Sequence, residues 1–206
     1  TVSVTAVTID PHVIMLGIVI DKLGKKQLGK VQLQKIIYLM DAHIGLNSRT
    51  RYYRYQYGPY GPYDPELNSY IDTLVEKKWF VKKHKGSEIL VSGKNHSAFV
   101  KNYHDTFSEH QNEIDKLIAF LKPMKTSQAG RIATLYAVWN DFIIDGNTAP
   151  TDNQIIREVT TNWTVNKANT TDDTWQETLN KMRRNGIIPR GTGLHTLPKE
   201  QEDSDE

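Results

Sequence analysis

The sequence contains no cysteine among its 206 residues, which excludes disulfide bonds, thiolate metal ligands and cysteine nucleophiles. It also lacks a long apolar segment: the longest run, residues 13–20, includes a glycine and falls far short of the roughly 20 residues that a membrane-spanning helix needs. No charged segment followed by an apolar stretch and a small-residue cleavage site opens the chain, so we expect no secretory signal. We therefore expect a cytoplasmic protein, and a chain that begins with Thr1 reads as a processed product or as part of something longer.

The charge is distributed unevenly along the chain, although the net charge is only +2. Residues 22–101 hold 15 Lys and Arg against 6 Asp and Glu, whereas the tail at residues 200–206 holds 5 acids and no base. A basic region of this kind is typical of proteins that contact nucleic acid, although a solvated surface has the same composition. We expect the acidic tail to be disordered.

The first half of the chain predicts three helices followed by a β-hairpin. The expected elements are a short strand or arm at residues 1–9, helices at 11–23 and 30–44, a strand at 51–57, a turn at 58–62, a helix at 65–78 and a hairpin at 79–84 and 88–91. Asp10-Pro11 and Asp64-Pro65 have the pattern of helix starts, with an aspartate cap followed by proline. Three helices and a hairpin in this order are those of a winged helix.

The first half is expected to end with a long helix, and the second half predicts three helices and a short extended segment, with a polar loop at residues 162–171. The expected elements are a long helix at residues 97–121, helices at 127–145 and 151–163, a helix carrying Trp175, Leu179 and Met182, and a short extended segment at 187–191. We place a domain boundary at residues 122–127. The predicted organisation is therefore a winged-helix-like basic domain (1–122), a helical subdomain (123–199) and a disordered acidic tail (200–206), and the fold class is mainly α with a small β-hairpin.

Motifs of catalysis and cofactor binding are weak or incomplete. Residues 24–30 almost spell a phosphate loop, but Val31 stands where that motif needs Ser or Thr, and a helix precedes it. None of the seven histidines forms a His-Glu-x-x-His zinc motif, and no Gly-x-Ser-x-Gly elbow is present. We expect neither a metal nor a cofactor. A metal-dependent nuclease that relies on Asp72 or Glu88 stays open as a weak alternative.

The segment from Arg49 to Tyr63 is the strongest local feature. Its candidate contact residues are the basic Arg49, Arg51 and Arg54 and the aromatic Tyr60 and Tyr63. Tyrosine beside arginine suits base stacking, phosphate contacts and protein interfaces alike. The alternative is that several of these rings, in particular Tyr53, Tyr55 and Tyr57, pack into the core.

Lysines on the predicted hairpin form a second candidate contact surface. Lys82, Lys83 and Lys85 suit contacts with phosphates or with an acidic partner, although lysines also protect an edge strand from aggregation. The third predicted helix argues against reading bases in the major groove, because its outer face carries Glu66, Asp72 and Glu76. Some twenty residues also separate it from the second helix, where a helix-turn-helix uses three or four.

Several motifs together resemble a module at the carboxy-terminal end of some type I restriction–modification specificity subunits. The motifs are Leu33-Gln34-Lys35-Ile36-Ile37-Tyr38-Leu39-Met40-Asp41-Ala42-His43-Ile44-Gly45-Leu46, Arg54-Tyr55-Gln56-Tyr57-Gly58-Pro59-Tyr60, Asp64-Pro65-Glu66-Leu67, Leu135-Tyr136-Ala137-Val138-Trp139-Asn140-Asp141, Asp145-Gly146, Asn162-Trp163 and Met182-Arg183-Arg184-Asn185-Gly186-Ile187-Ile188-Pro189-Arg190-Gly191. The resemblance spans about residues 12–197. One departure is the doubled Gly-Pro-Tyr, at 58–60 and 61–63, where the pattern has one.

The resemblance implies a non-catalytic accessory module of a DNA restriction complex, without the lobes that read DNA. Its expected partners are other restriction–modification subunits, reached by docking, and the backbone of double-stranded DNA. The resemblance carries over no catalytic residue. The first-half motifs alone also resemble the Panacea-type antitoxin domain, so an antitoxin-like module that binds a toxin protein stays open as the alternative.

Overall fold

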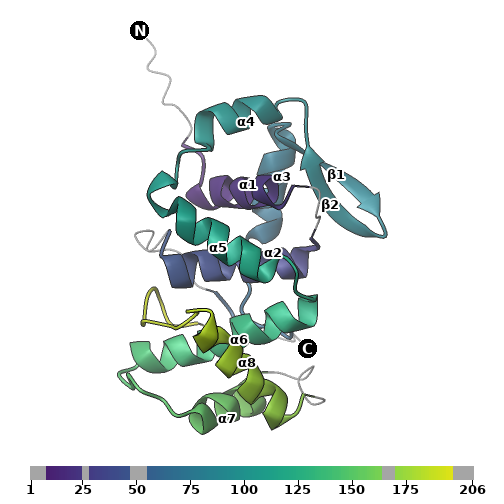
Figure 1. Cartoon of the computed structure of the whole chain (residues 1–206). Coiled ribbons are helices and arrows are strands. Elements are labelled where there is room, and N and C mark those ends of the chain that lie inside the picture. Colours follow the sequence, from purple (N-terminus) through teal and green to yellow (C-terminus); the bar gives the residue numbers. More distant parts are fainter. Residues whose placement is uncertain (1–7, 25–27, 47–54, 164–169, 197–206) are drawn as a thin grey trace, which may run out of the picture.

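A computed structural model describes residues 8–24, 28–46, 55–163 and 170–196 of the chain, and Figure 1 shows it as mainly helical with one antiparallel hairpin. Its elements are α1 (Pro11–Leu23), α2 (Lys30–Leu39) with a π-helical turn (Met40–Ile44), α3 (Leu67–Glu76), β1 (Phe80–Lys85), β2 (Ser87–Ser92), α4 (His96–Tyr103), a 3-10 turn (Ser108–His110), α5 (Gln111–Leu121), α6 (Thr126–Ile144), α7 (Asp152–Asn162) and α8 (Asp172–Arg184). Among the described helices, none combines the length and the apolar character needed to cross a membrane.

Helix α1 lies at the centre of the first half and is buried nearly all round, as its sequence predicts. Asp10 caps it by accepting a hydrogen bond from the backbone N–H of His12 at 2.8 Å. Helices α2, α3 and α5 all pack against it. Gly17 allows α4 to approach, because a Cβ atom there would come within 2.4 Å of the Phe99 ring.

The hairpin is confirmed, with Phe80 opposite Ser92 and Lys85 opposite Ser87. It packs against α1 and α3, and its base is fixed by backbone hydrogen bonds between Trp79 and Gly93 and between Lys78 and Asn95. The strand predicted at 51–57 is wrong in its described part, where only a single bridge joins Gln56 to Tyr63. Residues 1–7, 51–54 and 200–206, for which the sequence predicts an arm, a strand and a tail, lie outside the described residues.

The long helix predicted at residues 97–121 is wrong, because the chain breaks between Tyr103 and Gln111. The break contains the polar sequence His104-Asp105-Thr106 and the 3-10 turn. It lets Phe99 of α4 pack beside Trp79 and Phe80, while Ile114, Ile118 and the rest of the apolar face of α5 pack on α1 and α2. A straight helix could not reach both surfaces, so tertiary packing overrides the continuous apolar spacing.

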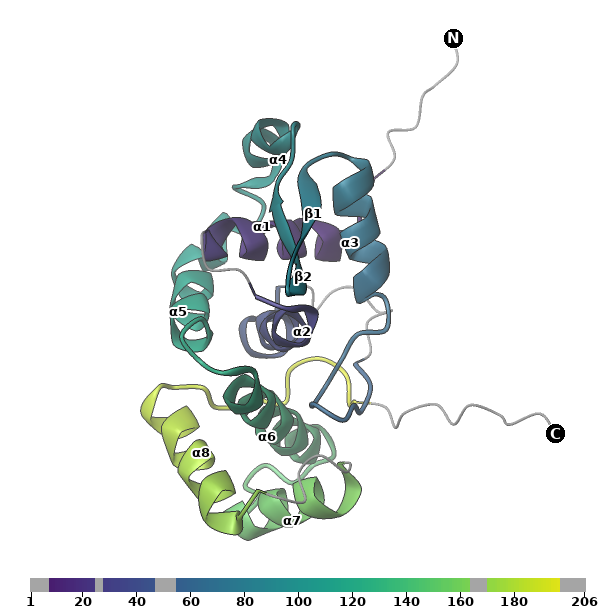
Figure 2. The same ribbon diagram turned by 90° about the vertical axis from the view of Figure 1, so that its right-hand side faces the viewer.

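The second half stacks on α2 through α6, whose other neighbours are α7 and α8 (Figure 2). Thr151 and Gln154 form a capping box that starts α7, the helix predicted at residues 151–163. After α8, residues 187–196 run back over α6 as an extended segment, which we call the C-terminal strap. The hydrophobic core continues across residues 122–127, so the boundary placed there stays a prediction.

Candidate functional site

Three segments that are separate in the sequence meet at one groove. They are the first turns of α2, the segment at residues 58–64, which we call the Gly-Pro-Tyr loop, and the start of α3. The groove has a volume of about 390 Å³, and each of the three segments belongs to a motif quoted above for the family resemblance. The groove is therefore the candidate functional site.

Two neighbouring side chains of α2 hold the loop by its backbone. The Gln34 amide accepts a hydrogen bond from Asp64 N and donates one to Asp64 O, both at 2.9 Å. Lys35 is buried, and its Nζ donates to the carbonyl oxygen of Pro62 at 3.1 Å. Because an irregular backbone buried beside a helix has no ladder partners, these side chains supply the hydrogen bonds that it needs.

Helix α6 supports the loop from behind, and two glycines make this possible. Gly61 has φ +106°, a conformation that favours glycine, and a Cβ there would lie 2.6 Å from the Thr134 hydroxyl oxygen. Across the contact, a Cβ added to Gly130 would lie 3.1 Å from the carbonyl oxygen of Tyr60. The second Gly-Pro-Tyr of the doubled motif thus places a glycine where the loop touches α6.

Asp64 connects the loop to α3. Its carboxylate accepts a hydrogen bond from the backbone N–H of Glu66 at 2.8 Å, in the turn before α3. The start predicted at Asp64-Pro65 is wrong by two residues, because Glu66 stands at the N-cap position and α3 begins at Leu67. Burial raises the pKa of this carboxyl to about 6, although the Glu66 hydrogen bond and nearby His12 oppose the shift. Asp64 therefore orders the turn that leads into α3, bonds to the Gln34 side chain and carries a carboxyl with a raised pKa.

The surface of the groove is apolar with a cationic edge. Tyr60 is 52% exposed at the rim, and Val31, Pro59, Pro65 and Leu67 add apolar surface. Lys30 stands at the edge with its ammonium 3.1 Å from a carboxylate oxygen of Glu88 in the hairpin. Surfaces that combine an exposed tyrosine with apolar neighbours and few convergent polar groups suit protein or peptide binding.

The two aromatic contact residues predicted in this loop differ in their surroundings. Tyr60 is exposed and available. Tyr63 also lines the groove but is half-buried: its hydroxyl donates to the side-chain oxygen of Gln56 at 2.7 Å, and a Cβ added to Gly58 would come within 2.7 Å of its ring. Tyr63 therefore shapes the loop, and Tyr60 is the side chain that a partner can reach.

The predicted basic residues are brought together only in part. Arg49, Arg51 and Arg54 lie outside the described residues. Lys82 lies 3.7 Å from carboxylates of both Asp72 and Glu88, so it joins the hairpin to α3. Lys83 is exposed, and the side chain of Lys85 is outside what the structure describes.

The acids Asp72 and Glu88, on which the nuclease alternative depends, are engaged in this ion-pair cluster. A hydrogen bond from Lys30 holds the pKa of Glu88 below its ordinary value, and Lys82 acts in the same direction. Across the described ranges, no group of three or more His, Asp or Glu side chains is arranged to hold a metal ion.

A buried polar cluster lies at the other end of α2, and sequence reasoning missed it. Asp41, in the π-helical turn, accepts hydrogen bonds from Tyr55 and pairs with Nε2 of His12 at 2.9 Å. His12 is 1% exposed and stacks on Tyr70 at 5.8 Å between ring centroids. The alternating tyrosines at 53, 55 and 57 were the only sequence feature that pointed to this cluster. Tyr55 is buried, in agreement with the alternative that these rings pack into the core.

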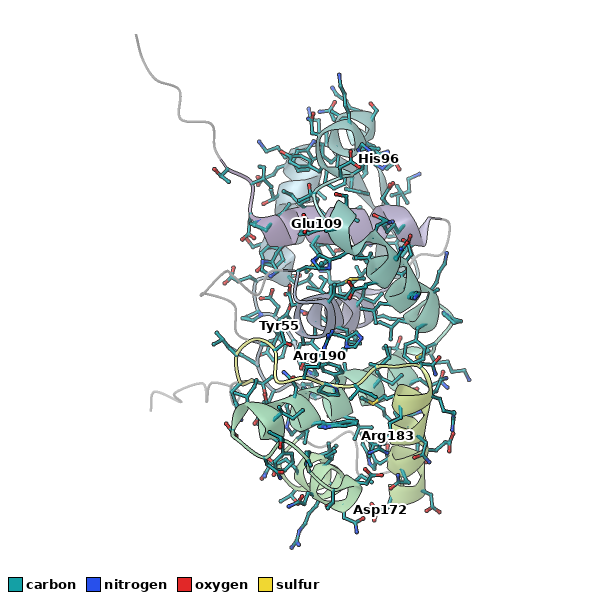
Figure 3. All side chains as sticks on the ribbon, turned by 60° about the vertical axis from the view of Figure 1, so that its left-hand side comes forward. Tyr55, His96, Glu109, Asp172, Arg183 and Arg190 are labelled. Atoms are coloured by element: carbon teal, nitrogen blue, oxygen red, sulfur yellow. The ribbon has the colours of Figure 1, made fainter. Side chains whose placement is uncertain are left out.

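The motifs of the second half contact those of the first. Tyr57 stacks on Trp163 at 4.0 Å between ring centroids, and the Tyr136 hydroxyl lies 3.1 Å from Nδ1 of His43. Arg190 of the strap donates to the carbonyl oxygen of His43, and Figure 3 shows Arg190 and Tyr55 on neighbouring parts of the molecule. The residues of the resemblance thus form one connected structure.

Comparison with known proteins identified no matching family model, no matching curated protein and no matching solved structure.

Proposed function

We propose that the chain is a non-catalytic accessory module of a type I DNA restriction–modification complex and that it docks other subunits through the groove beside the Gly-Pro-Tyr loop. The convergence of the motif segments on this groove carries the proposal. Its base is fixed by Gln34 and Lys35, while Tyr60 is left exposed at its rim. A preorganised apolar groove with an exposed aromatic side chain binds a partner at a low cost in conformational entropy.

Subunit docking has better support than a DNA-backbone contact by the hairpin. Lys82 is paired with two carboxylates, and α3 presents Asp72 and Glu76 where a groove-reading helix would need neutral or basic residues. We propose a winged-helix-like arrangement for the first half, with the hairpin as the wing. Its element order and the packing of the hairpin on α1 and α3 support this, while the connection across residues 45–66 is far longer than that of a helix-turn-helix.

The test uses purified methylation and specificity subunits of a type I complex and the fluorescently labelled chain. We expect a saturable complex that Tyr60→Ala weakens by tenfold or more, because central tyrosines often dominate interface energy. Val81→Ala is the matched control, since Val81 is 42% exposed on the hairpin and does not line the groove. Absence of a complex at about 10 µM subunit, or equal losses in both variants, contradicts the proposal.

An antitoxin-like module is the second candidate, because every residue that lines the groove comes from the first-half motifs or their flanks. It predicts a tight one-to-one complex with a toxin protein whose affinity changes little with salt. The connected contacts between the two halves, such as Tyr57 on Trp163, favour the restriction candidate, since only that resemblance includes the second half. A cytoplasmic location is part of both proposals.

A further inference from the structure

A second groove lies between α6 and α8, which run side by side in Figure 2. It has a volume of about 610 Å³ and shares no lining residue with the groove at the Gly-Pro-Tyr loop. Its walls carry three cations, Arg131 from α6 and Lys181 and Arg184 from α8. The acids among its lining residues are Asp173 and Glu177.

The carboxylates of the groove form an ion pair with only one of these cations, Arg184. Glu177 pairs with Arg184 at 2.7 Å, and this contact holds the pKa of Glu177 below its ordinary value. Asp173 lies in the first turn of α8, where the helix dipole stabilises a negative charge. Within the described ranges, neither Arg131 nor Lys181 has a carboxylate within ion-pair distance. Lys181 lies over the Phe120 ring, with its Nζ 5.9 Å from the ring centroid, and acts on Glu177 only as a nearby charge.

The Arg131 guanidinium also has a hydrogen-bond donor without an acceptor. Its Nε is buried, and no hydrogen-bond partner is present among the described residues. A buried N–H of a charged group that makes no hydrogen bond is costly, and two cations facing one groove repel each other. An anion that binds in the groove relieves the repulsion between the two cations.

We infer that the groove between α6 and α8 binds a phosphate group through Arg131 and Lys181. A phosphate offers several acceptor oxygens arranged in three dimensions, which matches donors that arrive from two helices, whereas a carboxylate offers two oxygens in one plane. The phosphate is either part of a nucleic-acid backbone or belongs to a small free ligand. This inference is independent of the proposed docking function, because the two grooves share no lining residue.

The experiment titrates the full chain with two probes, a labelled 20-base-pair duplex followed by fluorescence anisotropy and inorganic pyrophosphate followed by calorimetry, both at about 50 mM salt. We expect Arg131→Gln and Lys181→Gln each to weaken binding about tenfold, as loss of a charge-assisted hydrogen bond does. Arg131→Lys keeps the charge but removes the Nε donor, so we expect an intermediate loss of about threefold. Arg157→Gln, an exposed cation on α7 outside the groove, is the control and should change affinity less than twofold.

The two probes separate the sources of the phosphate. Groove-dependent binding of the duplex alone identifies a nucleic-acid backbone, and groove-dependent binding of pyrophosphate identifies a free ligand. Thermal unfolding shows whether each variant is folded. If Arg131→Gln does not fold, Lys181→Gln, on the opposite wall of the groove, still tests the inference. No binding of either probe, or binding that Arg157→Gln weakens as much as the groove variants, overturns the inference.

Discussion

The Gly-Pro-Tyr loop and the C-terminal strap are both irregular segments held on helices by the same device. In the loop, the Gln34 amide bonds to both N–H and carbonyl groups of Asp64. In the strap, the Asn140 amide accepts from Gly191 N at 2.8 Å and donates to Thr192 O at 2.9 Å. A side-chain amide supplies one donor and one acceptor, which is what a stretch of backbone without ladder partners needs.

The two segments differ in what surrounds the amide. The loop is enclosed between α2 and α6 and receives the buried ammonium of Lys35, so its geometry is set by close packing. The strap lies at the surface, with Ile188 and Leu194 exposed, and is held by Asp141, which accepts from both N–H and hydroxyl of Thr196. The loop is therefore fixed mainly by close packing, whereas the strap depends on hydrogen bonds to an ionisable carboxylate, that of Asp141.

Alanine substitution of one glycine in each segment gives the largest expected contrast. Gly61→Ala adds a Cβ at φ +106° that lies 2.6 Å from the Thr134 hydroxyl, so we expect a loss of about 3 kcal/mol in the free energy of unfolding from strain and overpacking together. Gly193→Ala has φ +85° but nothing within 4 Å, and strain alone should cost about 1 kcal/mol. Urea denaturation of both variants measures the difference, and equal losses would mean that the loop is not held by packing.

Replacing the Gln34 and Asn140 side-chain amides tests whether these two backbone-binding residues have different roles. Asn140→Leu leaves backbone groups of the strap without partners in a site that is 2% exposed, and we expect a loss of about 2 kcal/mol. Gln34→Met should cost about 1 kcal/mol, because water can reach the half-buried Gln34 site. Only Gln34→Met should also weaken subunit docking, measured in the binding assay with Tyr60→Ala. A docking loss of the same size in Asn140→Leu would contradict the assignment of the groove.

Features of the fold that depend on local sequence patterns were predictable, whereas features that depend on contacts between distant residues were not. Asp10 and Thr151 mark helix starts by short-range capping patterns, and the structure has both caps. The break between α4 and α5 could not be found, because Phe99 and Ile114 have helical spacing and only the position of α1 and α2 decides that they face different surfaces. Apolar periodicity reports burial and does not report which neighbour covers each side chain.

The sequence motif predicted which segment forms the candidate site, but it did not predict the contacts that hold that segment in place. The Gly-Pro-Tyr repeat pointed to the segment, and Tyr60 is exposed as expected. The roles of Gln34 and Asn140 depend on partners 30 and 51 residues away, and no local pattern distinguishes an amide that clamps a backbone from one that faces solvent. Lys82 shows the converse, because a lysine that suits a phosphate contact is held by Asp72 and Glu88 instead.

The free energy of unfolding should fall as the pH rises from 5 to 7, and a substitution at the strap can separate the contribution of Asp141 from that of Asp64. Burial raises the pKa of Asp141 to about 6, against the opposing hydrogen bonds from Thr196, and Asp64 in the loop has a similar value. A carboxyl whose folded pKa lies above its unfolded value binds more protons in the folded state. Its contribution to stability is therefore complete below about pH 4 and is lost as the pH rises through about 6. Each carboxyl should contribute a loss of about 1 kcal/mol between pH 5 and 7.

His195 extends the decline to higher pH. Burial lowers its pKa, but the Thr196 carbonyl, Asp141 and Asp145 outweigh burial and leave a raised value, so the stabilisation it supplies is lost as pH rises through that value. Asp141→Asn keeps the side-chain shape and an acceptor for Thr196 N while removing the titration. The loss of stability between pH 5 and 7 should therefore be smaller by about 1 kcal/mol than in the wild type. The remaining change comes from Asp64 and His195, and it is opposed by His43, whose pKa is lowered by burial. An unchanged slope would show that Asp141 is not the group that makes the strap sensitive to pH, and the contrast between shape and ionisation would fail at the strap.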